Sequence, residues 1–145
     1  MIRGIYQHKM GRILAIDYGL KRTGLAVTDP LKIIANSLDA VATHDLVKYL
    51  ENYFLKEEVE RVVIGLPKNL NNEPTHTTKP VEDFVQLFKK KFKIPIETHD
   101  ERFTTKIAFQ SMIQSGVSKK DRRNKGLIDQ VSATVILQSY LESMN

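Results

Sequence analysis

Short apolar runs and polar, glycine-containing turns alternate along the first part of the chain. Ile13 to Ile16 form an apolar run that ends at Asp17, and Leu25 to Val27 form a second run after a basic turn flanked by Gly19 and Gly24. Short apolar runs bounded by turn residues are typical of buried strands. The pattern predicts a hairpin whose first strand carries a carboxylate at its carboxyl end.

The next segments predict a third strand and a first helix. Ile33 to Leu38 follows the turn-forming pair Asp29 and Pro30, and three strands with short connections favour antiparallel pairing. Between His44 and Phe54 the apolar residues recur at helical spacing. These residues are Leu46, Val47, Leu50, Tyr53 and Phe54.

Strands and helices alternate in the rest of the chain. Arg61 to Gly65 is a β-branched run after a helix, which predicts a buried parallel strand. Thr77 or Thr78 can cap the following helix, and a further strand is expected over Ile94 to Asp100. The apolar face of the helix that begins near Thr77 or Thr78 is expected to contain Val81, Phe84, Val85 and Phe88.

Two more helices complete the predicted fold. One begins at about Thr105 and ends at Gly116, and the last begins at Gly126 and is apolar on more than one face, so it should be largely buried. The order of elements predicts an α/β fold with a five-stranded mixed sheet, its first three strands antiparallel, and helices on both faces.

Composition limits the functional classes. The 145 residues contain no cysteine, which excludes disulfides, cysteine-ligated zinc and thiol catalysis. No apolar run approaches the roughly 18 residues of a membrane helix, and Met1 to Met10 lack the apolar core of a secretory signal. We expect a cytoplasmic protein without membrane association, with an N-terminal extension over 1–11 and one domain over 12–143.

The net charge of +5 permits a polyanionic partner. Residues 119–125 hold five positive charges and one negative charge. Such a run is often a solvated loop, but a basic loop also grips phosphate backbones. The candidate nucleic-acid contacts are therefore Lys119, Lys120, Arg122, Arg123 and Lys125 in this run, with Lys21, Arg22, Lys68, Asn69 and Arg102 near predicted strand ends.

Three acids are expected to lie close together. Asp17 and the pair Asp100 and Glu101 follow strands that we take to be parallel neighbours, and Asp129 lies in the last helix, where small residues let the helix approach the sheet edge. A divalent cation would offset the repulsion between such carboxylates. Oxygen ligands without cysteine favour Mg²⁺ or Mn²⁺, and two such ions hydrolyse phosphodiesters. The sequence predicts Asp17, Glu101 and Asp129 as metal-binding catalytic residues.

Each acid also has an ordinary structural interpretation. Asp17 can begin a turn, Glu101 can favour a helix N-terminus with Arg102 as its partner, and Asp129 can pair with Lys125. Their joint placement near strand ends and basic loops favours a site. Asp100 ranks below Glu101 because strand alternation points the two in opposite directions. The four histidines are interpreted as ordinary residues, and Tyr18 is the one aromatic expected to touch nucleic acid.

At these residues the sequence resembles the YqgF/RuvX family, whose members are described as Holliday-junction resolvases and as nucleases of pre-16S ribosomal RNA processing. The resemblance implies a ribonuclease H-like fold, a bacterial cytoplasmic protein, and Asp17, Glu101 and Asp129 as metal-binding acids. The sequence departs from the family pattern at Asn71 to His76 and in the first ten residues. The matching segments are Asp17 to Gly24, Val63 to Asn69, Asp100 to Thr105, and Lys125 with Asp129 to Leu137.

The expected function is a metal-dependent nuclease that cleaves structured nucleic acid, processing the 5′ end of pre-16S rRNA on ribosomal precursor particles. One alternative is a Holliday junction resolvase in DNA recombination and repair, for which two symmetric cuts would call for a homodimer. A second is a non-catalytic nucleic-acid-binding factor of ribosome maturation. A third is a nucleotide-binding ATPase, because Asp17 to Gly24 resembles a phosphate loop, although such proteins close two domains around ATP.

Overall fold

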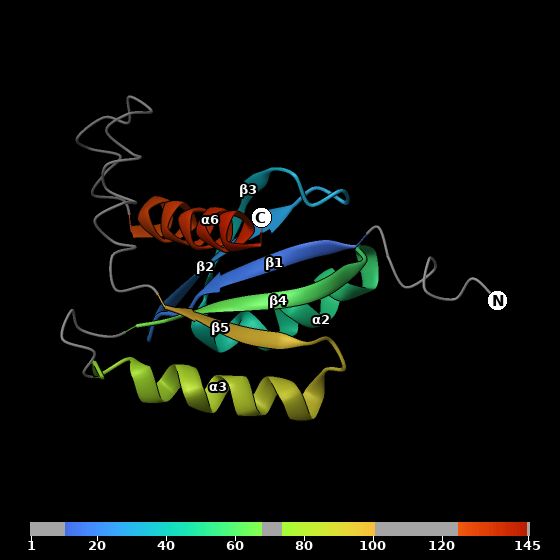
Figure 1. Ribbon diagram of the computed structural model, residues 1–145. Coiled ribbons are helices and arrows are strands. Elements are labelled where there is room, and N and C mark those ends of the chain that lie inside the picture. Colours follow the sequence, from blue (N-terminus) through green and yellow to red (C-terminus); the bar gives the residue numbers. More distant parts are fainter. Residues whose placement is uncertain (1–10, 68–73, 101–124, 145) are drawn as a thin grey trace.

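The computed structural model describes residues 11–67, 74–100 and 125–144, and the side chains of the last helix from residue 131 onward. The described strands form one five-stranded sheet in the order β3-β2-β1-β4-β5 (Figure 1). The strands are β1 Arg12–Asp17, β2 Arg22–Thr28, β3 Ala35–Ala42, β4 Val59–Leu66 and β5 Ile96–Asp100. β1 and β3 pair antiparallel with β2, whereas β1, β4 and β5 are mutually parallel. The predicted mixed sheet is confirmed, in agreement with a ribonuclease H-like fold.

Helices cover both faces of the sheet, as predicted (Figure 1). The 3-10 turn η1 Thr43–Asp45 leads into α2 Leu46–Lys56, which packs with α3 Thr78–Lys91 against one face. Helix α6 Lys125–Ser143 covers the other face. The helix expected from about Thr105 to Gly116 lies outside the described residues.

Strand alternation separates two apolar cores. Leu14 and Ile16 of β1 pack with α2 and α3, whereas Ile13 and Ala15 pack with α6. The expected apolar face of α3 is confirmed, since Val81, Phe84, Val85 and Phe88 are all buried. Because the middle of β1 is buried on both faces, its polar side chains lie at its two ends, Arg12 and Asp17.

The predicted position of the third strand was wrong at both ends. The strand spans Ala35–Ala42, and Ile33 and Ile34 lie in the preceding turn, where they are 66% and 59% exposed. The Asp29 carboxylate accepts hydrogen bonds from the backbone N–H groups of Leu31, Ile33 and Ile34 at 2.7–3.0 Å. These amides are therefore hydrogen-bonded to the Asp29 side chain within the turn and do not pair with β2.

The expectation that β1 and β5 are neighbours was also wrong, because β4 lies between them. Val62, Val63 and Ile64 of β4 are fully buried, whereas β5 is partly exposed along its length. A strand that is apolar on both sides fits a central position, and a more polar strand fits an edge. Helix α6 lies over β2, β3 and β1.

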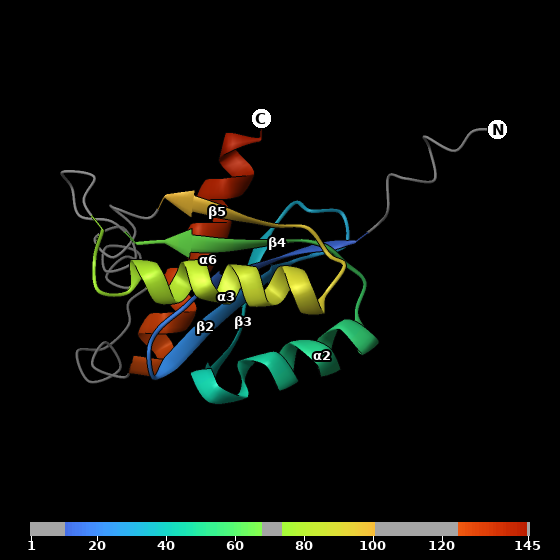
Figure 2. The same cartoon turned by 90° about the horizontal axis from the view of Figure 1, so that it is seen from below.

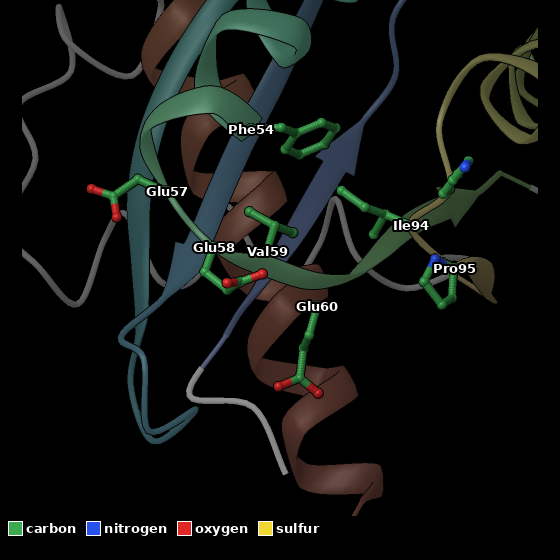
Figure 3. Close-up of a pocket in the computed structure, with 8 residues that line it drawn as sticks. Phe54, Glu57, Glu58, Val59, Glu60, Ile94 and Pro95 are labelled. Atoms are coloured by element: carbon green, nitrogen blue, oxygen red, sulfur yellow. The ribbon is translucent and has the colours of Figure 1, made fainter. Parts of the chain in front are cut away.

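A cavity of about 420 Å³ lies at the opposite end of the sheet from Asp17, where β4 and β5 begin. Figure 3 shows Phe54, Val59 and Ile94 gathered there, with the carboxylates of Glu57 and Glu60 pointing away from them. Glu57 pairs with Arg12 at 3.4 Å, and Glu60 pairs with Lys32 at 2.7 Å. Because Glu57, Glu58 and Glu60 outnumber the one lining cation, Lys93, this cavity is poorly suited to a phosphodiester.

Candidate active site at the carboxyl edge of the sheet

Asp17 is the last residue of β1 and is partly exposed. It shares its side of the strand with Ile13 and Ala15, so it faces the side of the sheet that α6 covers. Directly opposite it in the antiparallel pair lies Gly24 of β2. The sequence pattern had placed Gly24 at the end of the turn. In the structure it is part of strand β2.

The strands β1, β4 and β5 run parallel, so their carboxyl ends meet at one edge. Figures 1 and 2 both place the start of α6 at this end of the molecule. Asp129 lies near the start of α6. The structure thus brings the helix segment that carries Asp129 to the same end and the same face of the sheet as Asp17.

Asp100 ends β5 and is paired in register with Leu66 of β4. It has the parity of Ile96, whose side chain packs with the core under α2 and α3. Asp100 and Asp17 therefore lie two strand spacings apart, about 10 Å, and face opposite sides of the sheet. Glu101 lies outside the described residues.

The loop between Asp17 and β2 is held by hydrogen bonds from a distant segment. Thr43 donates its hydroxyl proton to the Gly19 carbonyl oxygen at 2.6 Å, and its backbone N–H donates to the Lys21 carbonyl oxygen at 2.9 Å. The hydroxyl oxygens of Thr43 and Thr23 are 2.9 Å apart. Sequence reasoning missed Thr43; the available signal was Thr23, a polar residue within an apolar strand that proves fully buried.

Gly19 occupies a position that requires glycine. A Cβ atom there would lie 2.1 Å from the Arg22 carbonyl oxygen, far inside van der Waals contact. Lys21 and Arg22 are both exposed beside this turn. The tight turn therefore places two cations on the surface within a few residues of the Asp17 carboxylate.

The ring of Tyr18 packs against the protein, and the residue stays partly exposed. Its ring lies 5.3 Å from the ring of Phe84, centroid to centroid, and it is partly buried against the core under α2 and α3. This packing anchors the residue after Asp17, and contact of the partly exposed Tyr18 with nucleic acid stays a prediction.

A second threonine fixes the stems of the polar loop after β4. The Thr78 hydroxyl donates to the Pro67 carbonyl oxygen at 2.5 Å and accepts a hydrogen bond from the Thr75 backbone N–H at 2.8 Å. Thr77 precedes α3 but makes no side-chain cap hydrogen bond. Thr77, one of the two predicted residues, is therefore the N-cap residue without a side-chain hydrogen bond, whereas the Thr78 hydroxyl joins the two stems.

Most other predicted contact residues cannot be placed from the described part of the chain. Among residues whose side chains are described, no three acids or histidines gather as a metal-binding group. Of the proposed metal ligands only Asp17 has a described side chain, and its oxygen ligand at an accessible sheet edge suits a hard cation. Outside the described residues lie Lys68, Asn69, Glu101, Arg102, Lys119, Lys120, Arg122 and Arg123, whereas Lys125 and Asp129 are placed by their helix backbone alone.

None of the helices in the described ranges is long and apolar enough to cross a lipid bilayer. This finding agrees with the absence of a long apolar run in the sequence.

Comparison with known proteins gives extensive matches. The chain is 54% identical over 135 residues to the "Putative pre-16S rRNA nuclease" of Bacteroides thetaiotaomicron, covering 92% of this chain and 98% of that protein. The proteins of the same name from Bacteroides fragilis and Flavobacterium psychrophilum are 53% and 54% identical, over 92% and 91% of this chain and 98% and 97% of theirs.

A solved structure of Pelota from Archaeoglobus fulgidus matches with a TM-score of 0.47 and 11% identity, over 99% of this chain and 40% of that chain, which is too distant to inform function. The family model described as "RuvX: Holliday junction resolvase" matches residues 11–143. The chain therefore belongs to the RuvX family.

Proposed function

We propose that this protein is a metal-dependent nuclease that hydrolyses phosphodiester bonds and processes the 5′ end of pre-16S rRNA. Relatives that are more than half identical over nearly their whole length carry the name "Putative pre-16S rRNA nuclease". The observation that carries the proposal is the position of Asp17, an accessible carboxylate at the carboxyl edge of the sheet, on the face to which α6 brings Asp129. Such edges are where open α/β sheets bind their ligands.

The proposed catalytic residues are Asp17, Glu101 and Asp129, which would hold Mg²⁺ or Mn²⁺ through carboxylate oxygens. Two such ions, when bound, activate water and stabilise the leaving oxygen of a phosphodiester. Lys21 and Arg22, exposed beside Asp17, would neutralise substrate phosphates and orient the backbone. The basic run of residues 119–125 would extend this grip along the strand.

The proposed nuclease domain consists of residues 12–143. It would bind its substrate in the cytoplasm, on ribosomal precursor particles. The family description favours a second candidate, cleavage of Holliday junctions, for which two symmetric cuts would call for a homodimer. The active-site chemistry is common to both because RNA and DNA share the phosphodiester.

The decisive experiment assays cleavage of a 5′-extended 16S precursor, a Holliday junction and single-stranded RNA, each with Mg²⁺ or Mn²⁺. Wild type is compared with Asp17→Asn, which removes one charge at nearly constant size, and with Asp83→Asn, a control at an exposed acid of α3. We expect cleavage of the precursor by wild type and Asp83→Asn, and a loss of at least about 100-fold in Asp17→Asn.

Equal cleavage by wild type and Asp17→Asn would show that the assigned site is wrong. Preferred cleavage of the junction would favour the resolvase. Binding with steep salt dependence but no cleavage by any variant would identify a non-catalytic maturation factor. Charge reversal at Arg122 and Arg123 should weaken binding to all three substrates alike, since phosphate contacts carry no sequence information.

A further inference from the structure

Thr43 connects two parts of the protein that are far apart in the sequence. It follows β3 at the start of η1, yet its hydrogen bonds end on the loop between β1 and β2. The loop consists of Tyr18 to Lys21, between the Asp17 carboxylate and the first residue of β2. A single residue thus fixes the turn that immediately follows the proposed metal ligand.

The direction of each hydrogen bond follows from proton counting. A threonine hydroxyl has one proton, and the Thr43 hydroxyl donates it to the Gly19 carbonyl oxygen. The 2.9 Å contact with Thr23 must then be a donation from the Thr23 hydroxyl to the Thr43 oxygen. Thr23 is fully buried, so this short chain of hydrogen bonds is anchored in the core of the protein.

The two contacts of Thr43 have an electrostatic consequence for the loop. Both the Gly19 and the Lys21 carbonyl oxygens accept hydrogen bonds from Thr43, so these partial negative charges are directed toward η1. A phosphate approaching Asp17 would be repelled by carbonyl oxygens that faced it. Holding them inward leaves the Lys21 and Arg22 side chains to set the potential of the exposed surface.

We propose that Thr43 is a positioning residue that holds the Tyr18–Lys21 loop in its phosphate-accepting conformation. The proposal rests on the proposed function, because the loop is assigned to substrate phosphates through its position beside Asp17. Thr43 acts through the loop and not through contact with the substrate. Its hydroxyl is the critical group, since the hydrogen bond from the backbone N–H survives substitution by any residue except proline.

The test compares Thr43→Val, which removes the hydroxyl at nearly constant shape, with Thr43→Ser, which retains it. The dissociation constant for a 5′-extended 16S precursor RNA is measured without divalent metal over a range of salt concentrations, together with the melting temperature. We expect Thr43→Val to weaken binding about tenfold, the equivalent of one net hydrogen bond. The salt dependence should become shallower as phosphate contacts are lost, and Thr43→Ser should bind within about twofold of wild type.

A purely structural role would lower the melting temperature of Thr43→Val and leave the dissociation constant and salt slope of the folded protein unchanged, which would overturn the proposal. Equal weakening by Thr43→Val and Thr43→Ser would also overturn it. The result is separable from the nuclease assignment: wild type that binds but does not cleave contradicts the assignment alone. If wild type cleaves, Asp17→Asn does not, and Thr43→Val binds RNA as wild type does, only the positioning role of Thr43 is contradicted.

Discussion

Asp17 and Gly24 lie opposite each other in the antiparallel pair of β1 and β2, on the side of the sheet that α6 covers. Opposite residues place their Cβ atoms about 5 Å apart. A side chain at position 24 would therefore stand beside the Asp17 carboxylate, in the space that the proposed metal ion or substrate phosphate would enter. The glycine at this position places no side chain beside the Asp17 carboxylate.

Gly24→Val should lower the cleavage rate per folded molecule at least about tenfold, because the added side chain crowds Asp17. The matched control is Ala26→Val, which adds bulk on the same face of β2 but opposite Ala15. Ala26→Val should lose about 1–3 kcal/mol of unfolding free energy through overpacking, because Ala26 is fully buried. The measurement is kcat/KM on the 16S precursor, corrected for the folded fraction; equal rates for the two variants would refute the steric argument.

Gly19→Ala should distort the turn after β1, because its Cβ would lie 2.1 Å from the Arg22 carbonyl oxygen, a backbone atom that cannot rotate away. We expect a loss of about 1–3 kcal/mol of unfolding free energy and weaker RNA binding. Leu20→Ala is the control, since Leu20 lies in the same loop but is 56% exposed. Urea denaturation and RNA titration measure both effects, and identical behaviour of the two variants would exclude a tight turn.

Thr78→Val should lower the unfolding free energy by about 1–3 kcal/mol, because the Pro67 carbonyl and the Thr75 amide both lose their partner. Thr77→Val changes a neighbouring hydroxyl that makes no cap hydrogen bond, and its effect should stay within about 0.5 kcal/mol. Chemical denaturation of the two variants in parallel gives the comparison. Similar losses in both would contradict the role assigned to Thr78.

Asp29 should contribute to the pH dependence of stability. Backbone hydrogen bonds lower the pKa of its carboxyl group from the ordinary value of 3.8. The bond from the Ile34 N–H has the largest effect, and those from Ile33 and Leu31 have smaller ones. A pKa that is lower in the folded state gives stability that is present above the unfolded value and is lost as the pH falls through the folded value.

Asp29→Asn should therefore be less stable than wild type at neutral pH, and this difference should shrink as the pH falls below about 4. Urea denaturation from pH 7 to pH 2.5 measures it. Asp83→Asn, which changes an exposed acid on α3, should show a smaller dependence on pH. A difference between Asp29→Asn and wild type that stays constant across the range would contradict the assigned hydrogen bonds.

The sequence predicted elements well where one periodicity dominated. The apolar run ending at Asp17, the helical stripe from Leu46 to Phe54 and the apolar face of α3 correspond to observed elements. The third strand was misplaced because the apolar pair Ile33 and Ile34 lies in a turn whose backbone is bound by Asp29. Apolar character alone does not distinguish a strand from a turn held by a side chain.

Local chemistry by itself determined the α/β class, the antiparallel start of the sheet, and Asp17 as an acid at a strand end, because these features depend on residue spacing over a few positions. Only the tertiary structure decided that β4 separates β1 from β5 and that Thr43 binds the Gly19 turn. Strand order depends on which strands can be buried on both faces, and the Thr43 contact joins residues 24 positions apart. Both are consequences of packing between distant segments, which no local pattern contains.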